Sequence, residues 1–241
     1  MPRLSPLLAF CLAALAAPVP VSADTGSYQY VQQASQARKT HYVTRGEARI
    51  ERLAIARYGP FRVLNDGTAA LVGSTDARSP GAFRSMMNAH PEIATLRFVE
   101  CPGTYDDHAN LALGRLIRAA GLAAVVPDDG SVRSGAVELL LAATSLQIDD
   151  GAEFAVHAWA DQHGYEATDY PADSPENRKY LTYYREMGMT PSTAAAFYAM
   201  TNSVPFEDPR WMSGSEMRGW VGSPPADDVQ LAYLDLRPTL N

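Results

Sequence analysis

Cysteine is almost absent from this chain. Only two cysteines, Cys11 and Cys101, occur among its 241 residues. Cys11 lies in an N-terminal segment that we expect to be removed, so a disulfide within the mature chain is excluded. Stability must therefore come from packing, and a chain of this length can bury a sizeable core in one domain.

An excess of positive charge is also lacking. The 20 Lys and Arg residues stand against 27 Asp and Glu residues, which gives a formal net charge of −7. A surface of this sign repels phosphate backbones and anionic lipid headgroups. We therefore expect neither a nucleic acid nor an anionic membrane surface as a partner.

Long apolar runs are missing as well, since none reaches the about 18 residues that a transmembrane helix needs. Residues 7–17 are apolar and follow Arg3, and Val21, Ser22 and Ala23 form a small-x-small cleavage pattern. This arrangement is typical of a secretory signal peptide. Removal of residues 1–23 leaves 218 residues with a formal charge of −8. We expect a periplasmic or secreted protein with no membrane span.

The rest of the chain is predicted to form a polar N-terminal extension over residues 24–58, irregular or partly helical, and one domain over residues 59–241. The domain begins with apolar residues 61–64 and 69–72 on either side of Asn65, Asp66 and Gly67. An Asp-Gly pair between two apolar runs favours a β-hairpin.

Strands and helices then alternate. Ser79 and Pro80 are typical of a helix start, and strands are predicted over residues 94–99, 122–126 and 154–156, with helices over residues 107–120 and after Ser134. Alternation of this kind predicts an α/β fold with a mostly parallel sheet and ligands beyond the carboxyl ends of its strands. The loops over residues 101–107 and 127–134 both leave such ends, so we expect them to face one crevice.

Three further helices are predicted from the caps at Ser174, Thr190 and Ser213, and a last strand over residues 229–236. The first of these helices carries a stripe of Tyr180, Tyr183, Tyr184 and Met187. A stripe at this spacing is more often core or subunit interface than a platform for substrate.

Ser134 and His157 are the residues that indicate chemistry. Ser134 precedes an apolar helix, whose first N–H groups favour negative charge, and His157 follows one helix and one strand later. A nucleophile, a base and N–H donors are the parts of an acyl-transfer site. Each residue alone has a simpler interpretation, Ser134 as a helix N-cap and His157 as a hydrogen-bonded structural histidine.

The order of these features resembles the Clp protease/crotonase superfamily, and most closely its exported serine peptidase-like members in bacteria. The resemblance runs over about residues 61–222. It rests on a turn where Cys101, Pro102, Gly103 and Thr104 stand in place of Ser-Pro-Gly-Gly, on Ser134-Gly135-Ala136 before an apolar helix, and on His157 after the next strand. It implies a (ββα)n spiral with later helices for packing or oligomerisation, a homo-oligomer, and no cofactor.

The resemblance also implies roles for particular residues. Ser134 is the nucleophile, His157 the general base and Asp208 the carboxylate that orients the base, with Glu207 as the alternative. The oxyanion donors are the N–H of Gly135 and that of Gly103 or Thr104, where Thr104 replaces a family glycine.

Two departures leave the function open between two classes. Arg133 stands where a small residue is usual, and Glu138 lies one turn after Ser134. The first hypothesis is a serine hydrolase or peptidase acting on a peptide or protein. The alternative is an inactive Clp-like fold that binds a peptide or protein, with Arg133 or Glu138 filling the space between Ser134 and His157. Crotonase-like acyl-thioester chemistry is a third, weaker interpretation.

Other reactive side chains have plainer interpretations. Asp107 is predicted as a helix cap beside Asp106 and His108 rather than as a metal ligand, because no matching second ligand group is evident. Cys101 precedes a Pro-Gly turn without an evident base, so we expect a packed thiol. Trp159, Asp161 and His163 follow the base and are candidates for lining the cleft. No metal site is expected.

Overall fold

The structure, a computed structural model, describes residues 41–65 and 67–222. Its first helix, α2 (His41–Leu53), lies in the region predicted as a partly helical extension and packs against β4 (Thr95–Cys101). The expected signal peptide and the strand predicted over residues 229–236 lie outside the described residues.

The predicted hairpin is confirmed. Strand β2 (Phe61–Val63) pairs antiparallel with β3 (Thr68–Val72), with Phe61 opposite Leu71, and β1 (Ala56–Tyr58) pairs with the other edge of β2. β3 then pairs in parallel with β4. Phe61 and Leu71 have no exposed surface, which explains the apolar character of this hairpin.

The sheet divides at β4. The first half of this strand pairs in parallel with β5 (Ala123–Val126), which pairs with β7 (Ser145–Ile148). The last two residues pair in parallel with β6 (Ser131–Arg133), which pairs with β8 (Glu153–Val156). β9 (Arg210–Ser213) runs antiparallel to β8. The predicted α/β fold with a mostly parallel sheet is therefore confirmed, and it brings the carboxyl ends of β6 and β8 side by side.

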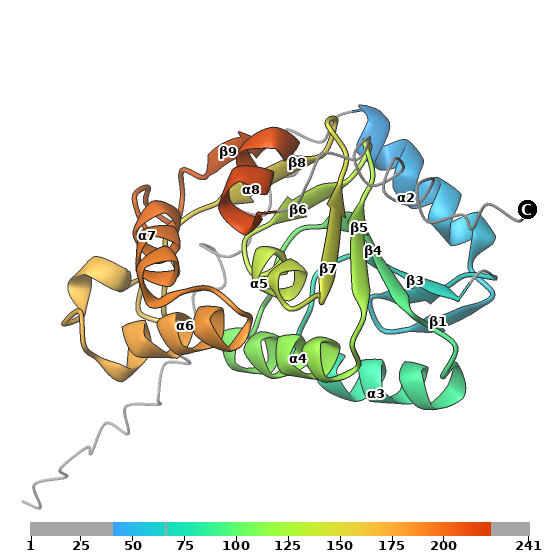
Figure 1. The fold of residues 1–241 in the computed structure, drawn as a ribbon, viewed down its shortest axis with the longest axis horizontal. Helices are drawn as coiled ribbons and strands as arrows, with labels where there is room; N and C mark the ends of the chain where they lie inside the picture. The colour runs from blue at the N-terminus through green and yellow to red at the C-terminus, as the bar shows by residue number, and fades with distance from the viewer. Residues whose placement is uncertain (1–40, 66, 223–241) are drawn as a thin grey trace, which may run out of the picture.

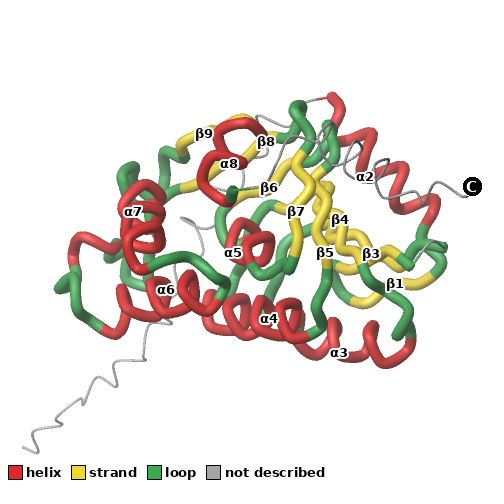
Figure 2. Tube along the Cα trace, viewed as in Figure 1, coloured by secondary structure: helices red, strands yellow, loops and turns green. Residues whose placement is uncertain are grey.

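Helices cover this sheet, as Figures 1 and 2 show. α3 (Ser79–Ala89), α4 (Asp107–Ala119) and α5 (Ala136–Leu141) connect the strands, and α3 and α4 lie along the lower side of the view. α6 (Pro175–Glu186) and α7 (Pro191–Thr201) pack together at the left, after the short 3₁₀ helix η1 (Ala167–Asp169). α8 (Gly214–Val221) returns to β7 and β8. The described residues contain no helix that is both long and apolar enough to cross a bilayer.

The tyrosine stripe of α6 belongs to the core. Tyr180, Tyr183 and Tyr184 are buried at 5%, 0% and 1% exposure, in the same hydrophobic cluster as Leu113 and Ile117 of α4. Burial within one chain excludes these three rings from a subunit interface, which agrees with the core interpretation.

Several local predictions were wrong. β6, β7 and β9 fall in segments predicted as loop or helix, because strands of three or four residues carry too little periodicity to recognise. α4 is capped by Asp106, which accepts a hydrogen bond from the N–H of Ala109, and not by Asp107. Ser79 is the first residue of α3 rather than its cap.

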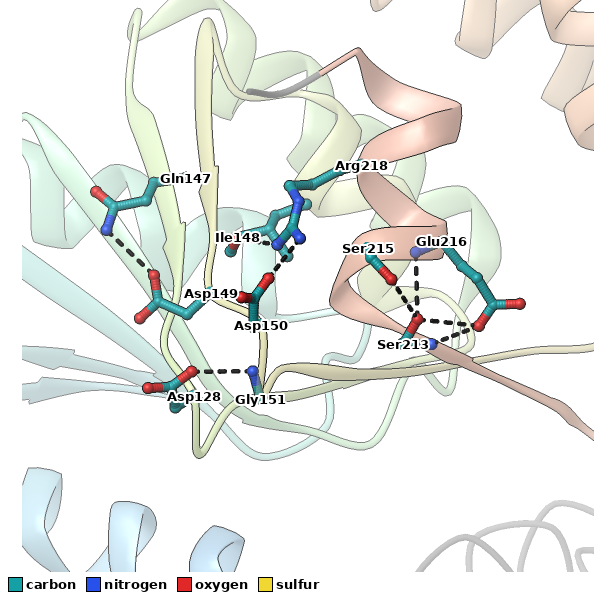
Figure 3. Close-up of polar contacts among 10 residues, drawn as sticks. All are labelled: Asp128, Gln147, Ile148, Asp149, Asp150, Gly151, Ser213, Ser215, Glu216 and Arg218. Carbon is teal, nitrogen blue, oxygen red and sulfur yellow. Dashed lines mark hydrogen bonds and ion pairs between the residues drawn. The ribbon is translucent and has the colours of Figure 1, made fainter. Parts of the chain in front are cut away.

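The turn between β7 and β8 is held from two sides (Figure 3). The Gly151 N–H donates to Asp128 Oδ1 at 2.9 Å. From α8, Arg218 donates to Asp150 Oδ1 at 2.5 Å and to the carbonyl of Ile148 at 2.7 Å. These contacts fix where β8 starts, and thereby where its carboxyl end delivers His157.

Candidate active site

Ser134 and His157 leave neighbouring strands at the same edge of the sheet. Arg133, the last residue of β6, pairs with Ala155 of β8. The Ser134 N–H continues the ladder by donating to the Ala155 carbonyl at 2.8 Å. Both side chains line one cavity, so the fold unites residues that are separated by a helix and a strand in the sequence.

Ser134 has an unusual backbone conformation. Its φ of 49° makes it the single non-glycine residue with positive φ in the described part of the chain. The left-handed region costs an L-residue about 1–2 kcal/mol, and such strain tends to occur at functional sites. Gly135, not Ser134, is the N-cap of α5, and no side chain caps that helix. The interpretation of Ser134 as a plain helix cap is therefore wrong.

Gly103 lies against the Ser134 side chain. A Cβ built on Gly103 would come within 2.8 Å of Ser134 Cβ and 3.2 Å of Ser134 Oγ, and the φ of Gly103 is 129°. Only glycine combines this conformation with so close an approach. The backbone at Gly103 is thus held beside the hydroxyl, where the resemblance placed an oxyanion donor.

A small polar network fixes the two turns around the hydroxyl. Asn110 Nδ2 donates to the Gly135 carbonyl at 2.6 Å, and Thr75 Oγ1 donates to Asn110 Oδ1 at 2.9 Å. The Thr75 N–H donates to the Gly103 carbonyl at 2.9 Å. Thr104 packs so closely that a Cβ on Gly135 would lie 2.5 Å from its methyl carbon. Sequence reasoning missed Asn110 and Thr75, because each lies far along the chain from Ser134.

This network determines which N–H groups remain for a ligand. The carbonyls of Gly103 and Gly135 are both used, whereas the hydrogen bonds found among the described residues do not use the N–H of either glycine. Two unused N–H groups beside one hydroxyl are the elements of an oxyanion hole.

The two ring nitrogens of His157, a residue that lines the cavity, differ in their surroundings. Its Nδ1 lies 2.8 Å from the Ala158 carbonyl oxygen, which can only accept, so Nδ1 carries the proton in this assignment. Nε2 is buried and has no hydrogen-bond partner among residues 41–65 and 67–222, so it makes no hydrogen bond to Ser134 Oγ. Burial lowers the pKa of His157, an effect partly offset by the Ala158 carbonyl and by the nearby charges of Asp107 and Glu166. With the proton on Nδ1, the neutral form of the ring has its lone pair on Nε2.

The structure does not bring Asp208 to His157. The Ala158 carbonyl occupies the Nδ1 side of the ring, where an orienting carboxylate would lie. Asp208 and Glu207 are both exposed in the turn before β9. From that turn, Phe206 contacts His157 instead, with its ring edge-on at 4.8 Å between centroids. Spacing alone could not reveal that a backbone carbonyl takes this position.

Neither Arg133 nor Glu138 bonds to the two candidate residues. The Arg133 side chain, 1% exposed, forms a buried ion pair with Glu100 and a hydrogen bond to Ser131. Glu138 accepts a hydrogen bond from the Tyr184 hydroxyl at 2.8 Å. The polar groups of Arg133 and Glu138 are therefore bonded to other residues and form no hydrogen-bonded bridge between Ser134 and His157, which the binding-module hypothesis expected.

Arg133→Met is expected to lower the free energy of unfolding by about 3–5 kcal/mol, because it removes the Arg133 charge from its buried ion pair with Glu100. Urea unfolding followed by circular dichroism measures this. The control is Arg57→Met, since Arg57 is 55% exposed in its pair with Glu51 and the expected loss is about 0–1 kcal/mol. Equal losses in the two variants would contradict the buried-pair interpretation.

The cavity beside Ser134 measures about 70 Å³. Its walls include the rings of Trp159, Tyr180, Tyr184 and Tyr198, and two carboxylates, Asp107 and Glu138, also line it. Of the three cleft candidates, Trp159 lines the cavity, whereas Asp161 and His163 do not. Asp161 instead holds its own loop by accepting bonds from the N–H groups of His163 and Tyr165.

Glu138 makes the stability of the protein depend on pH. Burial raises its pKa to about 7, an effect that the Tyr184 hydrogen bond only partly offsets. The folded state therefore holds a proton that the unfolded state has lost between about pH 4.5 and 7, so this residue's contribution falls as the pH rises.

Glu138→Gln is accordingly expected to gain up to about 3 kcal/mol of stability relative to the native protein between pH 5 and pH 8. Urea unfolding at the two pH values measures the change. Glu186→Gln, at an exposed glutamate of α6, is the control and should show no such gain. An equal pH dependence of the native protein and Glu138→Gln would exclude a buried, raised-pKa carboxyl at this position.

Other reactive groups are occupied elsewhere. The Cys101 thiol is buried against the Leu71 carbonyl at 3.3 Å, and burial raises its pKa, as befits a packed thiol. Within residues 41–65 and 67–222, no group of three or more His, Cys, Asp or Glu side chains is placed to hold a metal ion.

Comparisons with known proteins returned structural likenesses only. No protein-family model matches the chain, and no curated protein does. Among solved structures, the chain is similar to a membrane protease specific for a stomatin homologue from Pyrococcus horikoshii, at 11% identity and a TM-score of 0.43, covering 69% of this chain and 75% of that one.

Two further similar structures are a ClpP1 mutant from Listeria monocytogenes (14% identity, TM-score 0.44, 65% and 88% covered) and human enoyl coenzyme A hydratase domain-containing protein 3 (10%, 0.42, 75% and 76%). The α/β architecture of the chain is established by its own strand pairings, independently of these likenesses.

Proposed function

We propose that this chain is an exported serine hydrolase of the peptidase type, in which Ser134 is the nucleophile and His157 the general base. One observation carries the proposal. The unpartnered Nε2 of His157 and the strained Ser134 line the same cavity, with the backbone of Gly103 against the serine side chain.

The reaction follows from these positions. Ser134 Oγ attacks the acyl carbon as its proton passes to His157 Nε2, and the carbonyl oxygen becomes an oxyanion facing the N–H groups of Gly135 and Gly103. Collapse breaks the bond to the leaving nitrogen or oxygen, which takes the proton from His157. Water then attacks the acyl-enzyme, gives its proton to Nε2, and the acid is released with Ser134 restored.

The base is oriented by a backbone carbonyl rather than by a carboxylate. The Ala158 oxygen fixes the tautomer that leaves Nε2 free. Burial lowers the pKa of His157, and the nearby charges of Asp107 and Glu166 oppose this lowering, so they favour the imidazolium that forms during attack. The mechanism is therefore that of a Ser–His pair in which more distant carboxylates supply the negative charge. Catalytic hydrogen bonds are often long before substrate binds, so the missing Ser134–His157 bond is compatible with this role.

The proposal also covers the superfamily, the substrate class, the oligomeric state and the location of the protein. The ordered motifs around Gly103, Ser134 and His157 support a place in the Clp protease/crotonase superfamily, with a peptide or protein as substrate and a homo-oligomer as the working form. The N-terminal signal pattern supports a periplasmic or secreted location.

Labelling with a fluorophosphonate probe, located by peptide mass spectrometry, tests the proposal. We expect the label on Ser134 and its loss in Ser134→Ala and His157→Ala. Ser213→Ala is the control, because Ser213 is an N-cap serine exposed at α8 and should leave labelling intact. A folded protein that takes no label would overturn the hydrolase and favour the peptide-binding alternative.

A further inference from the structure

Two carboxylates are placed inside an aromatic cavity. Glu138 of α5 is four residues after Ser134 in the sequence, is 9% exposed, and lines the cavity together with Asp107 of α4. Burying a carboxylate is unfavourable unless it is paired or hydrogen-bonded. The partners of these two groups therefore show what the cavity is suited to hold.

The partners found are neutral phenols. The Tyr184 hydroxyl donates to Glu138 Oε1 at 2.8 Å, and the Tyr180 hydroxyl donates to Asp107 Oδ2 at 2.6 Å. The ion pairs of the described residues include neither carboxylate. Arg133, a cation at the cavity wall, has its charge directed to Glu100. Among the described residues, neither Asp107 nor Glu138 has a cation as its direct partner, so both carboxyl groups are available to a positively charged ligand.

The aromatic walls favour a cation as well. Trp159 and Tyr180 stack with 6.0 Å between their ring centroids, and Lys179 Nζ sits 5.2 Å and 4.9 Å from those centroids. A cation over such a ring is stabilised by the electrons of its face. Two of the aromatic side chains that line the cavity therefore already hold one primary ammonium, that of Lys179, which is not itself a lining residue.

We propose that the cavity selects substrates whose acyl half carries an alkylammonium group, with Glu138 as the specificity-determining residue. The inference rests on the proposed hydrolase function, because an acyl group attached to Ser134 Oγ would enter the cavity that Ser134 and Glu138 both line. A substrate amine of this kind comes from a lysine-like side chain or from a free N-terminus, and both offer the same charge.

Two matched esters isolate the charge from size and shape. The cationic ester is p-nitrophenyl 4-(trimethylammonio)butyrate. The neutral ester is p-nitrophenyl 5,5-dimethylhexanoate, which has a quaternary carbon in place of the quaternary nitrogen. We expect the native enzyme to favour the cationic ester in kcat/KM, and Glu138→Gln to reduce that preference about tenfold or more. The preference is compared between variants, so differences in the intrinsic reactivity of the esters cancel.

Glu186→Gln is the control, since it removes the same charge from an exposed position of α6. It should retain the preference of the native enzyme. A preference unchanged in Glu138→Gln, or lost equally in both variants, would overturn the assignment to Glu138.

The preference should also depend on pH. Burial raises the pKa of Glu138 to about 7, so the preference of the native enzyme should rise between pH 6 and pH 8, and this rise should be lost or much reduced in Glu138→Gln. The titratable and charged groups around this carboxyl are the Tyr184 hydroxyl, the Tyr180–Asp107 pair, Arg133 and His157, and Lys179 lies over the Tyr180 ring. Protonation of His157 disfavours the cationic ester in both proteins, so the part of the rise that Glu138→Gln lacks belongs to Glu138. A flat ratio in the native enzyme would contradict the role of Glu138.

Binding to Ser134→Ala separates this inference from the hydrolase proposal. Calorimetry with choline and its neutral analogue 3,3-dimethylbutanol should show preference for choline, lost when Glu138→Gln is added. If the native protein hydrolyses neither ester, the hydrolase proposal fails while choline preference still supports the cation site. If both esters are hydrolysed without preference, the hydrolase proposal is supported and the cation site is overturned. Equal binding of the two alcohols also overturns the cation site and has no bearing on the hydrolase proposal.

To tell the two sources of the amine apart, p-nitroanilides of lysine blocked at the α-amine and of alanine with a free α-amine are compared. Faster release from the blocked lysine assigns the cavity to a side-chain ammonium, and faster release from the free alanine assigns it to an N-terminus. Release from acetyl-alanine p-nitroanilide that exceeds both would overturn the proposal.

Discussion

Replacing His157 with glutamine is expected to lower kcat/KM for p-nitrophenyl ester hydrolysis by about 10²–10⁴-fold, the usual contribution of a general base. Glutamine keeps much of the volume beside Phe206 but cannot take a proton from Ser134. Steady-state kinetics at pH 7.5 measure the loss, and the circular dichroism spectrum confirms that the variant folds. Activity within a few-fold of the native protein would remove His157 from the mechanism.

Asp208→Asn is the companion variant, and its expected effect is less than about twofold. In a Ser-His-Asp triad, the same change lowers kcat about 10⁴-fold, because the histidine takes the wrong tautomer. Here the Ala158 carbonyl fixes the tautomer, and Asp208 is exposed. A large loss in Asp208→Asn would show that the turn before β9 moves its carboxylate onto His157 during catalysis.

Gly103→Ala is expected to lower kcat/KM by about 10²–10³-fold, the usual effect of losing one oxyanion donor. The added Cβ would lie 2.8 Å from Ser134 Cβ, so the turn has to move and its N–H no longer faces the oxyanion. Positive φ adds strain of about 1–2 kcal/mol, which urea unfolding measures separately from the rate.

Gly188→Ala is the matched control for Gly103→Ala. It introduces the same kind of backbone strain at positive φ but no contact with Ser134. Gly188 has a φ of 104° in the turn between α6 and α7, and its Cβ would meet only the end of the Arg118 side chain at 3.4 Å. This variant should lose stability while its kcat/KM stays near that of the native protein. If Gly103→Ala loses stability and keeps its rate, Gly103 has no part in the oxyanion hole.

Much of the architecture followed from local signals. Asn65, Asp66 and Gly67 between apolar runs marked the hairpin, because few residues suit so tight a turn. The helix starts at Pro175, Pro191 and Gly214 followed from the caps at Ser174, Thr190 and Ser213, whose oxygens accept N–H bonds from their own helices. Signals of this kind act within a few residues, so they are visible in the sequence.

Short strands were not visible in that way. β6 consists of Ser131, Val132 and Arg133, two of them polar, yet all three are buried. The partner that makes this burial acceptable, Glu100, stands 33 positions earlier on β4. A buried ion pair between distant strands leaves no periodic pattern, so the segment was predicted as a loop.

The candidate site also has features that the sequence shows and features that depend on tertiary contacts. The sequence by itself determined the candidates Ser134, Gly103 and His157, because their order and spacing follow a pattern. Only the tertiary structure decided how they are held: Ser134 in a left-handed conformation, His157 oriented by the Ala158 carbonyl, and Asp208 left exposed. The reason is physical, since a backbone carbonyl is present at every residue and its use depends on where folding brings it.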